Sequence, residues 1–225
     1  MESDLRGIIL DIDGTLIDSI AAHVESWRLA LSEFGVVADT ETIRTLVGMN
    51  AYSLLPASLG IEAYSVVGRA VKRRRREIYN SRFLPGLGAF PGARDLLCRL
   101  QDTGLTIVAV SASETDEAVA ALDVIGASPL VDLVVTSTDE PAGIHDHDLV
   151  RTALRKSGLR PEKSTMVGDT PYDAVASQKA GVPFIGVLCG GWPASAFPNA
   201  IAVYESPAEI LRDFPFPAVR TRAFS

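Results

Sequence analysis

Two hydrophobic patterns alternate along most of the chain. From residue 91 onward, short apolar runs alternate with segments in which apolar residues recur every three or four positions. The runs predict buried strands and the periodic segments predict helices. Such alternation is typical of a parallel, doubly wound sheet with helices on both faces, so we predict an α/β fold. Strands are expected at residues 7–10, 105–110, 130–135, 164–167 and 183–188, helices at 91–100, 115–125, 146–157 and 171–180, and shorter elements within 200–211.

The segment between the first and second strands has a different pattern. Ile20, Val24, Trp27, Leu31 and Phe34 follow a helical period, and no strand pattern occurs from residue 19 to residue 83. We therefore predict an all-helical insertion, which returns through the Pro- and Gly-containing residues 84–88. Its helices are expected at 19–34, 40–47, 52–58 and 62–79. The predicted domains are an α/β core of residues 1–17 and 87–225 and a helical domain of residues 18–86.

Two acids end the first predicted strand. Asp11 and Asp13 lie one residue apart and are followed by Gly14, where the chain turns. Residues two apart in a strand point to the same side, so both carboxylates leave the carboxyl edge of the sheet together. That edge is where open α/β sheets bind ligands. Neighbouring carboxylates repel each other unless a cation or a proton is shared, and Mg²⁺ prefers oxygen ligands.

Other predicted strands end in polar residues as well. Ser111 follows the strand at 105–110, Asp169 follows the strand at 164–167, and Asp173 lies in the first turn of the next helix. The carboxyl ends of parallel strands share one edge, so these residues are expected beside Asp11 and Asp13. Taken alone, Asp169 and Asp173 would suit a helix N-terminus. Together the four acids predict a divalent-cation site, and phosphate is the ligand that such a cation usually brings with it.

Composition narrows the possible partners and the compartment. Acidic residues exceed basic ones by 28 − 21 = 7 without a charged tail, which argues weakly against nucleic acid as a partner. Cys98 and Cys189 lie far apart and share no metal-ligand spacing, so reduced thiols and a cytoplasmic location are expected. The polar N-terminus leads directly into the first predicted strand, so no signal peptide is expected, and no apolar run approaches the ~20 residues of a membrane span.

Three motifs together resemble the haloacid dehalogenase-like hydrolases, a superfamily dominated by phosphatases. They are DIDGT at residues 11–15, the strand end at Ser111, and GDTPYD at residues 168–173. The helical insertion resembles the helical cap of one large subgroup. Its residues 16–35 and 46–49 resemble cap segments of phosphoglycolate phosphatases and β-phosphoglucomutases. The resemblance covers residues 5 to 211.

The resemblance implies a role for each motif residue. Asp11 would attack phosphorus to give an aspartyl-phosphate, and Asp13 would protonate the leaving oxygen and later activate water. Asp11, Asp169 and the backbone carbonyl of Asp13 would hold Mg²⁺, with Asp173 in support. Ser111 would bind the transferred phosphoryl group.

The resemblance also implies substrate contacts outside these acids. Backbone amides around Gly14 and Ala112 are candidates for binding the phosphoryl group. His23 corresponds to a substrate-side histidine of mutase-like members, with ordinary packing as an equal alternative. Arg44 is a weaker candidate for a substrate-binding loop.

One position departs from the family pattern. Ile144 stands where a lysine is expected, before HDHD at residues 145–148. Loss of one electrostatic donor costs about 10²–10³ in rate. Lys163, Arg151, His145 or His147 could substitute. The cationic run at residues 72–76 is interpreted as a solvated helix face.

We therefore predict a Mg²⁺-dependent phosphatase that acts on a small phosphorylated metabolite. A sugar-phosphate mutase is the first alternative, suggested by His23. A catalytically impaired relative that binds a ligand or a partner is the second, suggested by Ile144. The protein is expected to be a monomer or a weak homodimer that binds neither nucleic acid nor membrane.

Overall fold

The computed structural model describes residues 5–49, 51–139 and 148–214. Its sheet has six parallel strands in the order β3-β2-β1-β4-β5-β6, which confirms the doubly wound α/β fold. The order reverses between β1 and β4, and ligands bind beyond the strand ends at such a switch point. The strands are β1 (Gly7–Asp11), β2 (Thr106–Ser111), β3 (Leu133–Thr136), β4 (Ser164–Gly168), β5 (Phe184–Val187) and β6 (Ala202–Tyr204).

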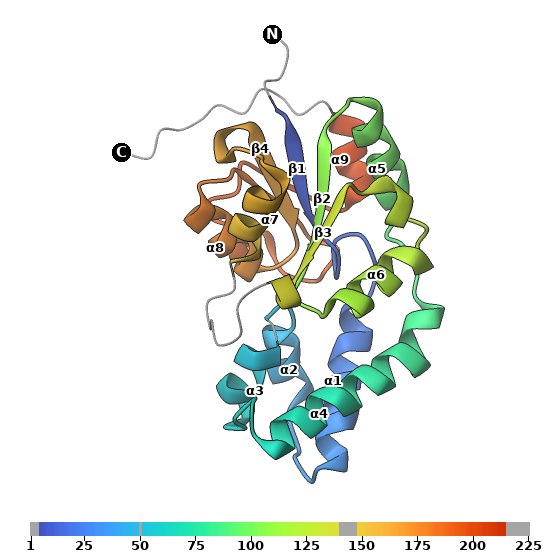
Figure 1. The fold of residues 1–225 in the computed structure, drawn as a ribbon, viewed down its shortest axis with the longest axis vertical. Coiled ribbons are helices and arrows are strands. Elements are labelled where there is room, and N and C mark those ends of the chain that lie inside the picture. Colours follow the sequence, from blue (N-terminus) through green and yellow to red (C-terminus); the bar gives the residue numbers. More distant parts are fainter. Residues whose placement is uncertain (1–4, 50, 140–147, 215–225) are drawn as a thin grey trace.

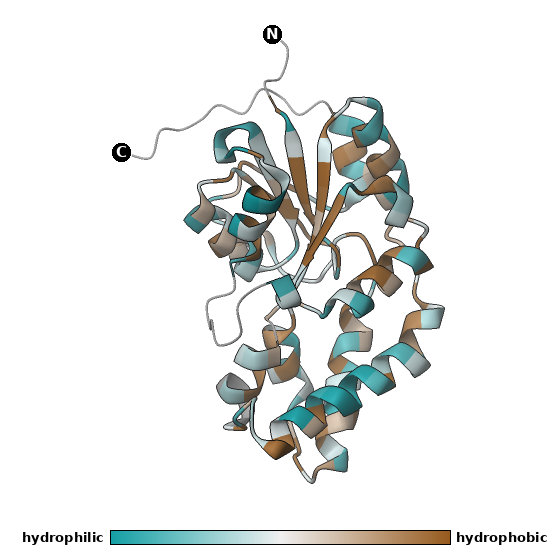
Figure 2. Ribbon diagram, in the orientation of Figure 1, coloured by the Kyte–Doolittle hydropathy of each residue, from teal (hydrophilic) through white to brown (hydrophobic). Residues whose placement is uncertain are grey.

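Helices cover both faces of the sheet (Figure 1). In β1, Ile8 and Leu10 pack on one face and Ile9 packs on the other, and all three are fully buried. This explains why the strand is a continuous apolar run rather than an alternating one. Figure 2 shows the same apolar strands between helices that carry both hydrophilic and hydrophobic residues. The first face carries α5 (Ala93–Asp102), α6 (Thr115–Val124) and α9 (Pro207–Asp213), and the second carries α7 (Leu149–Ser157) and α8 (Pro171–Ala180).

Four helices form an insertion beyond the carboxyl ends of the strands (Figure 1). This helical insertion has its own apolar cluster, in which Trp27, Leu31, Val71 and Ile78 are buried. The insertion therefore packs around a centre separate from that of the sheet. Its helices are α1 (Ile20–Glu33), α2 (Thr40–Leu46), α3 (Ala51–Leu59) and α4 (Val66–Ile78).

The two segments that join the insertion to the sheet lie side by side. The Asp18 amide donates to the Gly88 carbonyl at 3.0 Å, and the Phe90 amide donates to the Leu16 carbonyl at 3.0 Å. The chain therefore leaves and re-enters the sheet layer as one short antiparallel pair. The domain limits at residues 18 and 86 stay a prediction.

Several elements begin later than the sequence pattern predicts, α4 and β3 among them. Helix α4 begins at Val66 rather than at residue 62, because the Ser65 hydroxyl accepts from the Gly68 amide at 2.9 Å and caps the helix there. Strand β3 begins at Leu133, because Pro129 lies in a short 3₁₀ turn that precedes it. Across the described residues, no helix combines the length and apolar character needed to cross a membrane.

Candidate active site

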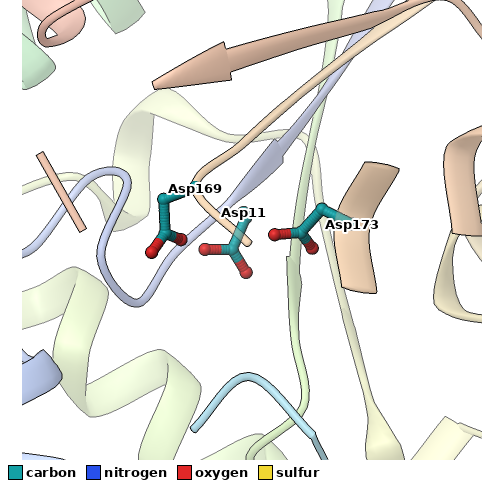
Figure 3. Close-up of side chains that lie close together, drawn as sticks. All are labelled: Asp11, Asp169 and Asp173. Atoms are coloured by element: carbon teal, nitrogen blue, oxygen red, sulfur yellow. The ribbon is translucent and has the colours of Figure 1, made fainter. Parts of the chain in front are cut away.

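Three carboxylates converge where the strand order reverses. Asp11 ends β1, Asp169 follows β4, and Asp173 lies in the first turn of α8. Leu10 is level with Val167 in the pairing of β1 with β4, which brings the two strand ends together. One oxygen from each of the three lies within 4.8 Å of the other two, and Figure 3 shows the groups pointing toward one another. The predicted cluster of Asp11, Asp169 and Asp173 is thus present in the geometry.

Among the described residues, no cation pairs with the three carboxylates of this cluster. Buried oxygens of Asp11 and Asp169 have no hydrogen-bond partner among the described residues. Burial, followed by repulsion from Asp173, raises the pKa of both groups well above the usual value. Burial also raises the pKa of Asp173, to about 6. Oxygen donors that lack a partner and are crowded in this way suit a hard divalent cation.

Glycines allow the backbone to approach this cluster closely. Gly14 has φ +87°, and a Cβ there would lie 2.4 Å from a carboxylate oxygen of Asp169. A Cβ on Gly190 would lie 1.7 Å from the same oxygen. The sequence singled out Gly14 but missed Gly190. The Gly14 amide donates to the Ile17 carbonyl at 3.0 Å, so this amide, predicted to help bind phosphate, is engaged within its own turn.

Asp13 lies in an environment opposite to that of Asp11. One of its oxygens accepts from the Ser19 hydroxyl at 2.8 Å and contacts His23 Nε2 at 2.7 Å, and the other accepts from the Ser111 hydroxyl at 3.0 Å. Burial opposes ionisation, but His23 and the two hydroxyls outweigh it and lower the pKa of Asp13 to about 2. Asp13 is therefore an anchored carboxylate, whereas Asp11 favours a proton or a bound cation.

His23 links Asp13 to helix α4. Its ring is buried, stacks on Tyr79 with centroids 4.3 Å apart, and contacts an Arg75 nitrogen through Nδ1. A guanidinium can only donate, so we assign Nδ1 as the acceptor and place the ring proton on Nε2, facing Asp13. His23 therefore does both: its ring packs on Tyr79, and its Nε2 contacts the motif acid Asp13.

Arg75 overturns the interpretation of residues 72–76 as a solvated face. It is 8% exposed, and its Nη1 lies 2.7 and 2.8 Å from the two oxygens of Glu117 on α6. The Ser113 hydroxyl donates to the same carboxylate at 2.8 Å. The interpretation was wrong for Arg75 because one side of α4 faces α6 rather than water. Sequence reasoning also missed Glu117, since its partner lies on a distant helix.

A pocket between the sheet edge and the helical insertion contains most of the predicted residues. The core contributes acids and Ala112, and the insertion contributes aromatic and cationic side chains. Ser111 is buried behind it, with its hydroxyl on Asp13. Arg44 is exposed and does not line the pocket. Its guanidinium lies near Gly191 instead, where an added Cβ would be 3.7 Å from Nη1. The residues that line the pocket include Asp11, Asp13, Asp173, His23, Trp27, Tyr52, Lys72, Arg75 and Arg76.

Two of the four candidates for the missing lysine lie away from this pocket. Lys163 precedes β4, at the edge of the sheet opposite the acids. Arg151 is an exposed residue of α7 whose Nε lies 3.0 Å from Asp148. Both candidates were therefore wrong. Ile144, His145 and His147 lie outside the described residues. Within the described part of the chain, the cations that line the pocket are Lys72, Arg75 and Arg76 of α4.

Comparison with known proteins agrees with this geometry. A phosphoglycolate phosphatase of Caulobacter vibrioides is 28% identical over 193 residues, which cover 83% of this chain and 81% of that protein. A validoxylamine A 7'-phosphate phosphatase of Streptomyces hygroscopicus subsp. limoneus is 28% identical over 182 residues, covering 80% and 84%.

Solved structures share the whole fold. A hydrolase from Pseudomonas syringae has a TM-score of 0.85 at 25% identity and covers 94% of this chain and 98% of its own. A β-phosphoglucomutase from Clostridium difficile has a TM-score of 0.78 at 20% identity, with coverage of 90% and 92%, and shows the fold alone. The model of the haloacid dehalogenase-like hydrolase family matches residues 8–187. With most of its length matched by that model, and with the acids of its motifs gathered at the switch point, the chain belongs to the haloacid dehalogenase-like hydrolases.

Proposed function

We propose that the protein hydrolyses phosphate monoesters of small metabolites through an aspartyl-phosphate on Asp11, with Mg²⁺ in the site. The observation that carries this proposal is the contrast between Asp11 and Asp13. Asp11 belongs to the acidic cluster and has a buried oxygen with no hydrogen-bond partner among the described residues, whereas Asp13 is an anchored carboxylate with a pKa of about 2. Two acids whose environments push their pKa values apart are suited to separate chemical roles. The relatives named as phosphatases support the same class of reaction.

The acidic cluster fits a divalent cation. Asp11, Asp169 and Asp173 would hold it, because their oxygens lie within 4.8 Å of one another and two of these oxygens have no partner among the described residues. A bound cation would favour the ionised carboxylates and offset the charge of the phosphate. Mg²⁺ suits an all-oxygen site of this kind and commonly binds phosphate together with carboxylates.

The chain's own residues then divide the work. An Asp11 oxygen bonds to phosphorus as the bond from phosphorus to the leaving oxygen breaks, and that oxygen takes a proton from Asp13. Asp13 is ionised before substrate binds, so it must first take up a proton, which the incoming negative charge of the phosphate favours. In the second half, water attacks phosphorus, and Asp13 accepts the water's proton. Phosphate leaves and Asp11 is regenerated.

Second-layer contacts keep Asp13 in place for both halves. The Ser19 hydroxyl and His23 hold one oxygen and Ser111 holds the other. Ser111 can turn its hydroxyl from Asp13 to a phosphoryl oxygen when substrate enters. Trp27 and other residues of the helical insertion line the pocket, so a substrate bound there would be shielded from bulk water on that side.

The test is release of inorganic phosphate from a panel of phosphate esters with Mg²⁺ and with chelator. Asp11→Asn is expected to lose at least about 10³-fold in kcat, because it removes the nucleophile. Asp95→Asn, which changes an exposed acid of α5, is the matched control. Rapid quenching of the unaltered protein should leave a phosphoryl group on the peptide that contains Asp11. Unchanged turnover by Asp11→Asn would overturn the assigned nucleophile.

The same panel separates hydrolysis from phosphoryl transfer within a sugar. The mutase alternative requires a hexose phosphate to isomerise without net release of phosphate. That outcome would replace the proposed phosphatase by a mutase while leaving Asp11 as nucleophile.

A further inference from the structure

Three cations of α4 line the pocket, and carboxylates of the described residues pair with only two of them. Lys72, Arg75 and Arg76 are three and four residues apart, so they share one side of the helix. Arg75 is paired with Glu117. Arg76 is paired with Glu114 and Asp116, two acids at the beginning of α6. Each arginine therefore forms ion pairs that link the helical insertion to the core.

Lys72 has a different environment. Its Nζ lies 3.4 Å from the ring centroid of Tyr52 and 5.6 Å from that of Tyr64, and the two rings are 4.8 Å apart. No carboxylate of the described residues lies within ion-pair distance of it. Burial, followed by the charge of Arg69, lowers the pKa of Lys72 against the influence of Glu114. The ammonium is thus partly desolvated, lies over an aromatic ring and is in no ion pair with a carboxylate of the described residues.

The position of Lys72 relates it to the reaction. Its side chain lines the same pocket as Asp11 and Asp13, but from the helical insertion rather than from the sheet. A second pocket shares Lys72, Tyr52, Arg76 and Glu114 with the first and adds Arg69, Arg73, Glu77 and Asn80. Its lining therefore has four cations and two acids, with Lys72 common to both pockets.

We propose that the phosphate ester hydrolysed here carries a second anionic group in its alcohol portion, and that Lys72 binds this group. This inference rests on the proposed phosphatase function. With the phosphate at the acids, the leaving alcohol extends toward α4, where Lys72 supplies the one pocket cation that no described carboxylate neutralises. A carboxylate or a second phosphate would each replace part of the water that Lys72 loses on burial.

The experiment uses short alkyl phosphates of matched lengths that end in a carboxylate, a second phosphate or a hydroxyl. The full-length protein with Mg²⁺ is expected to prefer an anion-terminated ester by kcat/KM. In Lys72→Met, the ratio of kcat/KM for that ester to kcat/KM for its hydroxyl partner should fall about 10- to 100-fold, the range expected for a charge-assisted contact. The change should appear mainly in KM, because the contact forms in the ground state as well.

Two further variants separate the lost contact from a lost charge. Arg74→Met removes a cation from another side of α4, where Arg74 pairs with Glu33, and should leave the ratio unchanged. Lys72→Arg should retain the preference for the anion. The carboxylate and bisphosphate esters show which anion the site takes.

Equal turnover of anionic and neutral esters, unaffected by Lys72→Met, would overturn this inference and leave the phosphatase proposal standing. Absence of phosphate release from every ester would instead overturn the phosphatase proposal. In that case thermal shifts with the same esters decide the subsite. A stabilisation by the anionic ester that Lys72→Met abolishes supports it, and equal shifts in both proteins contradict it.

Discussion

Arg75 and Glu117 form a buried ion pair that joins the helical insertion to the sheet domain. Nη1 of Arg75 lies 2.7 and 2.8 Å from the two carboxylate oxygens, and Glu117 is 3% exposed. The same guanidinium contacts His23, which in turn contacts Asp13. A continuous set of polar contacts therefore runs from α6 of the core through α4 and back to a motif acid. The position of Asp13 depends on how the insertion is seated.

Breaking this pair from one side should cost more than removing it altogether. Glu117→Ala leaves the buried Arg75 guanidinium without its carboxylate, and we expect the free energy of unfolding to fall by about 3–5 kcal/mol. The double variant Arg75→Met/Glu117→Ala removes the stranded charge and should recover a large part of that loss. Urea denaturation of the single and double variants measures both values. Additive losses in the double variant would show that the two residues do not act as a pair.

The low pKa of Asp13 predicts a contribution to stability that acid removes. A group whose pKa is lower in the folded state stabilises the fold above its unfolded pKa, near 3.9, and loses this contribution as pH falls toward the folded value. With a folded pKa of about 2, the contribution of Asp13 should decrease by about 1 kcal/mol between pH 6 and pH 3. Asp13→Asn should remove this part of the pH dependence. Denaturation curves of both proteins at the two pH values test it, and identical pH dependence would contradict the assignment.

The strands of the sheet were predictable because each one is marked by a run of consecutive apolar residues. Apolar runs such as residues 7–10 are buried on both faces, so their sequence excludes the alternation of a half-exposed strand. The acids at strand ends were predictable for a related reason, since all parallel strands end at one edge. Asp11 and Asp169 meet although they lie 158 positions apart in the sequence, because they stand at the ends of two strands that pair directly.

The contacts of α4 were not predictable from local patterns. Five successive cations at residues 72–76 place charge on every side of a helix, so periodicity does not indicate which of them is buried. Which cation is buried depends on how α4 packs against α6, because Glu117 of α6 forms the ion pair with Arg75. Gly190 was missed for the same reason. A side chain at this position would collide with Asp169, and the two residues are close only in the folded chain.

Magnesium should stabilise the protein more at alkaline than at acidic pH. The carboxyls of the cluster have raised pKa values in the folded protein without metal, so they favour the fold while protonated, and this support is lost as pH rises through the folded values, about 6 for Asp173. Mg²⁺ binds the ionised groups and competes with protons. At 100 times its Kd it should add about 2.7 kcal/mol, a rise in Tm of roughly 5–10 °C for a chain of this size.

Thermal unfolding with Mg²⁺ and with chelator at pH 5 and pH 8 measures the effect. Asp169→Asn is expected to abolish the stabilisation by Mg²⁺ while leaving the fold intact, because it removes one ligand and relieves repulsion. An equal rise in Tm for the unaltered protein and for Asp169→Asn would place the Mg²⁺ elsewhere.

Gly190 should be as important to the metal site as a residue that binds it. A Cβ there would lie 1.7 Å from an Asp169 carboxylate oxygen, so Gly190→Ala must displace that carboxylate or the loop that carries it. Loss of the contacts that orient a metal ligand typically lowers the affinity for the metal about 10- to 100-fold. We expect the affinity for Mg²⁺ to fall by at least this factor. Gly86→Ala is the matched control, because a Cβ at Gly86 meets no atom within 4 Å. Mg²⁺ titrations of phosphate release or of Tm give the two affinities. Unchanged Mg²⁺ affinity in Gly190→Ala would mean that Asp169 does not bind the ion in the position that the structure gives it.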